Sequence, residues 1–270
     1  MLKLLIAILI LFINDSFSQN LINPHGTLVH AIICEDGILL AADSRASWYY
    51  IDSSSGNLNT YAHTDSIKKI YALGVFRLGV SGYTILNNQR LEDIVDKFNK
   101  KNKPDSSIFE TFKKFHYFIN NKLKIPDSII SRNQYVLAGY ENKAPIVLTI
   151  DKGGKEIVMR KIGNRIYTDD IAAKYKYDLQ EPLTCDYVKP LIDLMYDSCA
   201  LAKKDIGTPV NIIKINNDNS VTDLNTFKFR KYKNQKEFFK AILSGAVNIK
   251  YDYPFSRDWL FKTLKREISE

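Results

Sequence analysis

The chain contains 270 residues, 45% of them hydrophobic and 25% charged, which is the balance of an ordinary globular protein with a sizeable core. Its formal net charge is +8, but the basic residues are spread along the chain and form no dense block interleaved with aromatics. A nucleic-acid partner is therefore not expected, and the basic residues are interpreted as a solvated surface. Nothing in the composition divides the chain, so one large domain is predicted.

The three cysteines show no CxxC spacing, so the sequence indicates neither a zinc site nor a disulfide framework. Cys34 lies in an apolar run and is interpreted as a small buried hydrophobe. Cys185 and Cys199 could pair in an exported protein, although sequence alone cannot fix the geometry that a disulfide needs. The four histidines are scattered as well, and neither a metal nor another cofactor is expected.

Residues 1–18 are typical of a secretory signal peptide. Lys3 precedes the apolar run 4–13, which at roughly ten residues is shorter than the about 20 needed to span a membrane. Ser16 and Ser18 suit cleavage before Gln19; an uncleaved membrane anchor is the alternative. The protein is therefore predicted to be exported, periplasmic or extracellular, with no stable membrane span after cleavage.

Short antiparallel strands are predicted for the next part of the chain. The turn signal Glu-Asp-Gly at 35–37 separates two β-rich runs, and Gly74 lies between two more. The polar segment 47–63 is interpreted as an inserted loop or an extended hairpin tip. The four expected strands cover 28–34, 38–42, 67–72 and 75–81.

Helices follow these strands. Apolar residues recur at three- and four-residue steps over 85–98, and a second helix is predicted after Pro104 with a cap at residue 105, 106 or 107. The later expected elements are strands at 135–139, 146–150 and 156–161, a helix at 187–203 and a strand at 210–215. The grouping of strands and helices favours an α+β fold rather than an alternating parallel sheet.

Two segments carry the most specific pattern in the chain. Residues 26–47, GTLVHAIICEDGILLAADSRAS, place a threonine behind a glycine and ahead of a strand-turn-strand pattern that ends in Asp-Ser-Arg. Residues 65–82, DSIKKIYALGVFRLGVSG, supply a second cue. Together they resemble the opening of a proteasome β-type subunit, an N-terminal nucleophile (Ntn) hydrolase. Segments 135–140 and 208–212 extend the resemblance to residues 26–224, and it implies a four-layer αββα sandwich of two stacked antiparallel sheets.

The resemblance also implies a catalytic site. Thr27 is the nucleophile position, and its free α-amine, with a reference pKa near 8, could accept the hydroxyl proton. Lys69 is expected beside it, held by Asp43. The backbone N–H of Gly82 is expected to stabilise the oxyanion. The full set of expected site residues is Thr27, Asp43, Arg45, Lys69, Gly82 and Asp205.

Together with the predicted signal peptide, the resemblance implies an exported threonine peptidase that cuts its own Gly26–Thr27 bond and so removes the short propeptide 19–26. Its partners would be a peptide or unfolded-protein substrate and, if it assembles, further copies of itself. The matched domain is 27–224, and 225–270 is a C-terminal helical extension of that domain. The segment 161–164 has no serine where the family carries one. A catalytically silent relative that acts in assembly or binding is therefore the alternative.

Overall fold

The structure, a computed structural model, describes residues 22–26, 28–51, 58–87, 89–126, 130–150, 155–168, 172, 182–202, 206–225, 230, 232–251 and 256–269. The predicted signal peptide, Thr27 and Asp205 lie outside these residues. Among the described helices, none is long and apolar enough to cross a membrane.

The largest sheet has nine strands, and every strand pair in it is antiparallel. In spatial order its strands are β12 (Glu156–Met159), β11 (Ala144–Ile150), β10 (Gln134–Glu141), β7 (Phe76–Tyr83), β1 (Ile22–Gly26), β4 (Ala46–Ile51), β5 (Leu58–Thr64) and β16 (Lys250–Tyr251), with β6 (Ile70–Leu73) paired to β7. β1 is an inner strand, because Gly26 pairs with Gly82 of β7 and His25 pairs with Ser47 of β4. The segment that leads into Thr27 therefore joins the two halves of this sheet.

A second sheet of five strands packs against the first. Its order is β13 (Arg165–Tyr167), β2 (Val29–Cys34), β3 (Gly37–Ala42), β14 (Asn211–Ile215) and β15 (Val221–Asp223). Side chains on one face of β2, such as Val29 and Ala31, meet residues of the large sheet, such as Val136. Ile32 and Cys34 point to the opposite face, where they pack with α6 (Cys185–Ala202). Both faces of β2 and β3 are thus apolar, as in a central strand covered on both sides.

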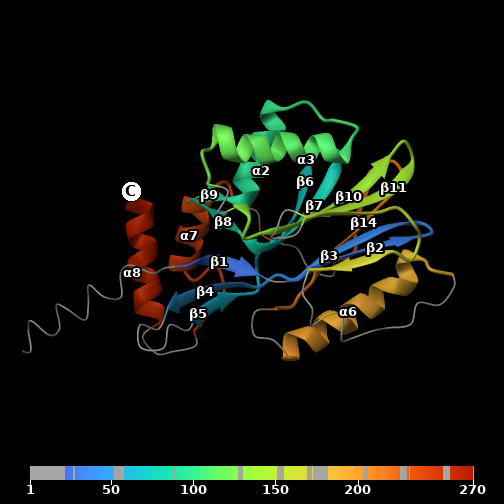
Figure 1. Cartoon of the computed structure of the whole chain (residues 1–270). Coiled ribbons are helices and arrows are strands. Elements are labelled where there is room, and N and C mark those ends of the chain that lie inside the picture. The colour runs from blue at the N-terminus through green and yellow to red at the C-terminus, as the bar shows by residue number, and fades with distance from the viewer. Residues whose placement is uncertain are drawn as a thin grey trace, which may run out of the picture.

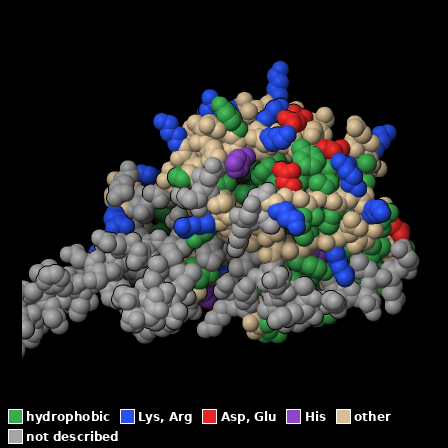
Figure 2. All heavy atoms as spheres, viewed as in Figure 1, with side chains coloured by type: hydrophobic (Ala, Val, Ile, Leu, Met, Phe, Trp, Pro, Cys, Tyr) green, Lys and Arg blue, Asp and Glu red, His purple; other side chains and the backbone are tan. Residues whose placement is uncertain are grey.

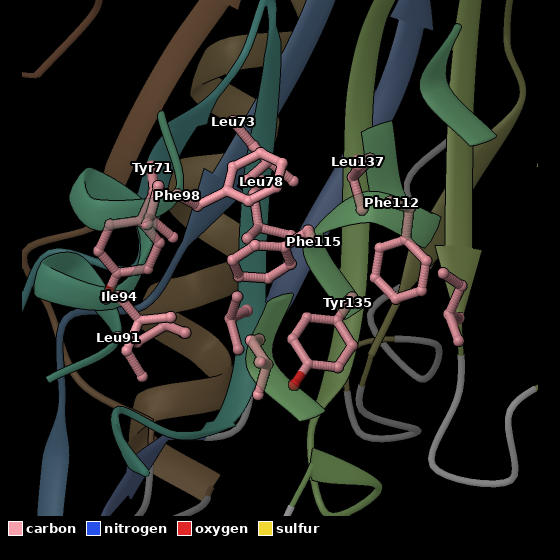
Figure 3. Close-up of a cluster of buried hydrophobic side chains, with 14 of the residues drawn as sticks. Tyr71, Leu73, Leu78, Leu91, Ile94, Phe98, Phe112, Phe115, Tyr135 and Leu137 are labelled. Atoms are coloured by element: carbon pink, nitrogen blue, oxygen red, sulfur yellow. The ribbon is translucent and has the colours of Figure 1, made fainter. Parts of the chain in front are cut away.

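The other face of the large sheet is covered by α2 (Leu91–Lys101), α3 (Ile108–Tyr117) and the π-helical turn η1 (Phe118–Lys122) (Figure 1). Figure 3 shows aromatic side chains from these helices, where Phe112 of α3 packs against Tyr135 from the sheet and Phe98 of α2 packs against Phe115 of α3. The Ser107 side chain caps α3 by accepting a hydrogen bond from the Glu110 amide.

The C-terminal part forms α7 (Gln235–Leu243) and α8 (Ser256–Ser269), which pack with β4 and β5 at one end of the large sheet. Their buried side chains, including Phe238 and Leu260, contact Trp48 and Tyr61 in a separate apolar cluster. On the face shown in Figure 2, Lys and Arg side chains are scattered among other surface types and do not form a continuous patch.

The expected four-layer αββα sandwich of two sheets is wrong for this chain. The described residues form three antiparallel sheets, the third being the ribbon of β8 (Ile85–Leu86) and β9 (Gln89–Arg90). The large sheet continues past β1 through β4, β5 and β16, and its apolar surface there requires its own cover. α7 and α8 supply that cover at the sheet end, outside any layer parallel to α2 and α3 (Figure 1).

Of the two alternatives given for the polar segment 47–63, the extended hairpin is confirmed, because it contributes most of the β4 and β5 strands, whose described residues pair from Ala46 with Thr64 to Ile51 with Leu58. One predicted helix differs. The helix expected over 85–98 begins only at Leu91, because Ile85 and Leu86 pair with β9 before the helix starts. Periodicity alone does not separate a short apolar strand from the start of a helix.

Candidate active site

Asp43 and Lys69 form a fully buried ion pair where the two main sheets meet. Lys69 Nζ lies 2.9 Å from Asp43 Oδ1 and 2.8 Å from Oδ2, and both residues are 0% exposed. Burying two charges costs several kcal/mol for each ion, roughly, unless the geometry and further hydrogen bonds are good. Such a pair is therefore an uncommon feature that requires a structural or chemical explanation.

Local pairing explains why Asp43 faces this point. Asp43 follows β3 directly, and its backbone N–H donates to the Leu28 carbonyl at 3.1 Å, which continues the β2–β3 ladder by one step. In return the Leu28 amide donates to Asp43 Oδ1 at 3.1 Å. Lys69 immediately precedes β6 and is brought to the carboxylate when β6 pairs with β7.

Thr27 itself lies outside the described residues, but both of its chain neighbours are described. Gly26 ends β1 and pairs with Gly82, while the Leu28 amide is bound by the same Asp43 oxygen that holds Lys69.

Burial lowers the pKa of Lys69 below its ordinary value, although the charge and hydrogen bonds of Asp43 oppose that effect. We interpret Lys69 as an ammonium because both carboxylate oxygens accept from it at short distances. A positive charge fixed in a dry site disfavours protonation of any amine close to it.

Arg45 binds Asp43 through its backbone and Asp65 through its side chain. Its backbone N–H donates to Asp43 Oδ2 at 3.0 Å, and its guanidinium binds Asp65 through Nε at 2.6 Å and Nη2 at 2.9 Å. Gly207 packs against both side chains, leaving no room for a Cβ atom. Arg45 therefore ties the segment that carries Asp43, and Asp65 and Gly207 are partners that the sequence patterns do not identify.

Gly82 has φ of +125°, a conformation that residues with a side chain rarely adopt. The neighbouring Tyr83 backbone is clamped by Asn133, whose Oδ1 accepts from the Tyr83 amide at 2.6 Å and whose Nδ2 donates to its carbonyl at 3.0 Å. Asn133 is 1% exposed and comes from a segment 50 residues away in the chain. It fixes the backbone that pairs with the residues just before Thr27.

The substitution Gly82→Ala is expected to lower the free energy of unfolding by roughly 3 kcal/mol, from the positive φ and from overpacking. A Cβ atom there would clash with Asn133 Oδ1 and approach the Arg132 carbonyl to 3.0 Å. Gly245→Ala is the matched control, because Gly245 also has positive φ, +75°, but has no neighbour within 4 Å of the added carbon. Urea unfolding of both variants should show a clearly larger decrease in the free energy of unfolding for Gly82→Ala than for Gly245→Ala. Equal decreases would contradict the packing argument.

The Arg45–Asp65 pair predicts a pH dependence. Burial would raise the pKa of Asp65, but the hydrogen bonds and charge of Arg45 lower it below its usual 3.8. A lowered folded pKa gives stability that is present above 3.8 and is lost as the pH falls through the folded value. The free energy of unfolding, measured from pH 6 downward, should therefore fall more steeply with pH for wild type than for Asp65→Asn. Asp96→Asn, an exposed carboxylate on α2, should keep the wild-type slope, and identical slopes for all three proteins would refute the assignment.

Asp205, the last of the expected site residues, lies outside the described residues. Within the described ranges, no three His, Cys, Asp or Glu side chains gather in a way that could hold a metal ion.

Comparison with known proteins identifies the fold only. No protein-family model matches the chain, and no curated protein matches its sequence. Anbu from Hyphomicrobium sp. strain MC1 matches with a TM-score of 0.49 and 13% identity, over 90% of this chain and 95% of that chain. The Anbu (Gly-1) mutant from the same strain gives a TM-score of 0.50 and 14% identity over the same shares.

The identification with proteasome β-type subunits is therefore wrong. The solved structure that matches in fold is of Anbu and not of a proteasome β-type subunit, and at 14% identity the likeness is distant. Short motifs around a site indicate a chemistry, but many branches of a fold can share them, so they do not specify one branch. The similarity to Anbu concerns the fold and assigns no activity.

Proposed function

We propose that the protein is an N-terminal threonine hydrolase that acts on peptides, with Thr27 as the nucleophile. The observation that carries the proposal is the buried Lys69 ammonium, held by Asp43, whose Oδ1 also binds the amide of the residue after Thr27. In the proposed reaction the Thr27 α-amine accepts the hydroxyl proton, and the hydroxyl oxygen attacks the peptide carbonyl. The leaving amine then takes the proton, and water hydrolyses the ester.

The charge of Lys69 supports this chemistry in two ways. A nearby cation lowers the pKa of the Thr27 α-amine, which keeps it unprotonated and able to act as a base near neutral pH. The same cation stabilises the developing negative charge on the attacking oxygen, since a fixed charge in a site without water acts strongly. Asp43 is needed to hold the ammonium, and Arg45 holds the segment that carries Asp43.

The backbone around β1 supports a peptide as the substrate. β1 runs antiparallel to β7 and β4 and leads to the Gly26–Thr27 bond, so an extended chain with its carboxyl end at Thr27 fits between these strands. Once Gly26–Thr27 is cut and residues 19–26 have left, another peptide could pair with the same two strands. We also propose export after removal of residues 1–18, and maturation by cleavage at this bond.

The second candidate is a catalytically silent protein that acts in assembly or binding. The inner position of β1 favours it, because the uncut segment completes the large sheet by linking β7 to β4. The serine-free segment 161–164 favours it too, since these residues instead form a turn in which the Gly163 amide donates to the Ile33 carbonyl at 2.8 Å.

Hydrolysis of peptide amides distinguishes the two candidates. Wild type should hydrolyse unstructured peptide amides, and Thr27→Ser should retain part of this activity through its hydroxyl. In Thr27→Ala the rate of hydrolysis should fall at least about 1,000-fold, a loss typical of a removed nucleophile. Circular dichroism should show that all three proteins are folded. If the folded wild type and Thr27→Ala hydrolyse peptides equally slowly, the enzyme proposal fails.

A further inference from the structure

Two cysteines far apart in the sequence meet at one corner of the five-stranded sheet. Cys34 ends β2 and Cys185 begins α6, and three hydrogen bonds join the segments that carry them. The Glu35 amide donates to the Leu183 carbonyl at 3.0 Å, the Leu183 amide donates to Glu35 Oε1 at 3.2 Å, and the Cys185 amide donates to Asp36 Oδ1 at 2.7 Å. The start of α6 is therefore fixed in position against the end of β2.

Their side chains lie in the same apolar cluster. Cys34 is 2% exposed and Cys185 is 0% exposed, and both pack with the α6 face of the sheet. The Cys185 thiol lies within hydrogen-bonding contact of the Cys34 thiol, and that contact together with burial raises the pKa of Cys185. Both cysteines are in the free thiol form here. The two sulfur atoms are thus neighbours in a packed and nearly dry environment.

Cys199 is excluded as the partner of Cys185. Both lie in α6, separated by 14 positions, and an α-helix rises about 1.5 Å per residue, so their Cα atoms are about 21 Å apart. A disulfide requires Cα atoms within about 7 Å. The Cys185–Cys199 pair considered from the sequence therefore cannot form in this fold, while Cys34 lies beside Cys185.

We propose that Cys34 and Cys185 form a reversible intrachain disulfide that fastens α6 to the β2–β3 hairpin when the chain meets an oxidising thiol–disulfide couple. One cysteine, as its thiolate, attacks a disulfide oxidant such as oxidised glutathione, forming a mixed disulfide and releasing one reduced thiol. The thiolate of the second cysteine attacks the sulfur of the first cysteine in this mixed disulfide, forms the intrachain S–S bond and displaces the remaining half of the oxidant as a second reduced thiol. The protein loses two protons and two electrons, and the oxidant is reduced to two thiols.

Burial of the two thiols determines how fast this reaction occurs. The thiolate is the attacking species, so a raised thiol pKa and little exposure make the folded, reduced pair slow to react. A cleft of about 610 Å³, lined by Cys34, Glu35, Asp36 and Tyr140 among others, gives a small oxidant one approach to this corner. We expect rapid closure during folding in an oxidising medium, and slow closure of the already folded protein that becomes faster as the pH rises.

The disulfide would close a loop that spans more than half of the chain. Crosslinks that close long loops restrict the unfolded chain strongly, so the oxidised protein should melt roughly 5–10 °C above the reduced one. This increase in melting temperature on oxidation should be absent from Cys34→Ala and Cys185→Ala. It should be present in Cys199→Ala, which removes the cysteine at the far end of the same helix.

The test uses the full mature chain refolded in a mixture of reduced and oxidised glutathione, then alkylated and digested without reduction. We expect a crosslinked peptide that joins Cys34 to Cys185, lighter by two hydrogen atoms than its parts, with Cys199 alkylated. The melting temperature of the wild type should fall on reduction, and that of Cys199→Ala should fall equally. Three alkylated cysteines in the folded wild type, or a crosslink that involves Cys199, would overturn the proposal whether or not the variants fold.

Discussion

Replacing Lys69 by alanine is expected to destabilise the folded protein by about 3–5 kcal/mol, because it leaves a buried carboxylate without its counter-ion. Asp43 is 0% exposed, and the remaining hydrogen bonds to it come from the Leu28 and Arg45 amides among the described residues. These two donors cannot replace a cation. Urea unfolding at neutral pH measures the loss directly.

Two variants make this prediction specific. Asp43→Asn combined with Lys69→Met removes both charges with side chains of similar size, and it should be more stable than Lys69→Ala alone, since an unpaired buried charge is the main cost. Lys250→Ala removes an exposed lysine with a 3.3 Å ion pair to Asp65 and should change stability by at most about 1 kcal/mol. A loss for Lys69→Ala no larger than that of Lys250→Ala would show that the buried pair is not as described.

The second large effect is expected at the Gly26–Thr27 bond. If Thr27 is the nucleophile, its hydroxyl attacks the Gly26 carbonyl, the Gly26–Thr27 amide bond breaks to leave an ester and a free α-amine, and water then hydrolyses the ester. Glycine at 26 leaves the carbonyl unhindered. Wild type should therefore be found almost entirely as a chain that begins at Thr27, and Thr27→Ala almost entirely as the longer chain beginning near Gln19. Lys69→Ala, if it folds, should slow the cleavage.

The position of β1 adds a second expectation about this cleavage. Because β1 pairs with β7 and with β4, cutting its end does not remove the hydrogen bonds along its length. The peptide 19–26 should remain bound after cleavage and leave only on dilution or mild denaturation. Native mass spectrometry should then show the cut chain with the peptide attached, and denaturing conditions should show the two separately. Identical N-termini for wild type and Thr27→Ala would contradict the autolysis itself.

The sequence predicted the local elements better than their assembly. Turn and cap chemistry is local, so the 35–37 turn and the cap before α3 could be read directly from the residue types. The placement of Asp43 beside Lys69 followed only from the resemblance, because no local pattern brings together residues 26 positions apart. Asp65, Asn133 and Gly207 were missed for the same reason, since each acts through contacts made by distant segments.

The layer arrangement and the solved structures of similar fold could not be predicted correctly from the sequence. The polarity of segment 47–63 left an inserted loop and an extended hairpin open, and it gave no sign that the hairpin strands would extend the large sheet and so change where the C-terminal helices pack. The motif residues surround one site and leave most of the 270-residue chain unconstrained, so they indicated a chemistry and not the branch. Thr27, Asp205 and the predicted signal peptide lie outside the described residues, so their roles remain predictions.

The central claim is that Thr27 is the nucleophile, and the most direct measurement is the site of reaction with an electrophilic peptide. The full protein, allowed to mature, is incubated with a peptide that carries an electrophilic group at its carboxyl end, and the modified residue is located by digestion and mass spectrometry. The account predicts one adduct, on the Thr27 residue at the N-terminus of the cut chain, and none in Thr27→Ala. An adduct on another residue, or an unmodified chain in which Gly26 is still joined to Thr27, would contradict it.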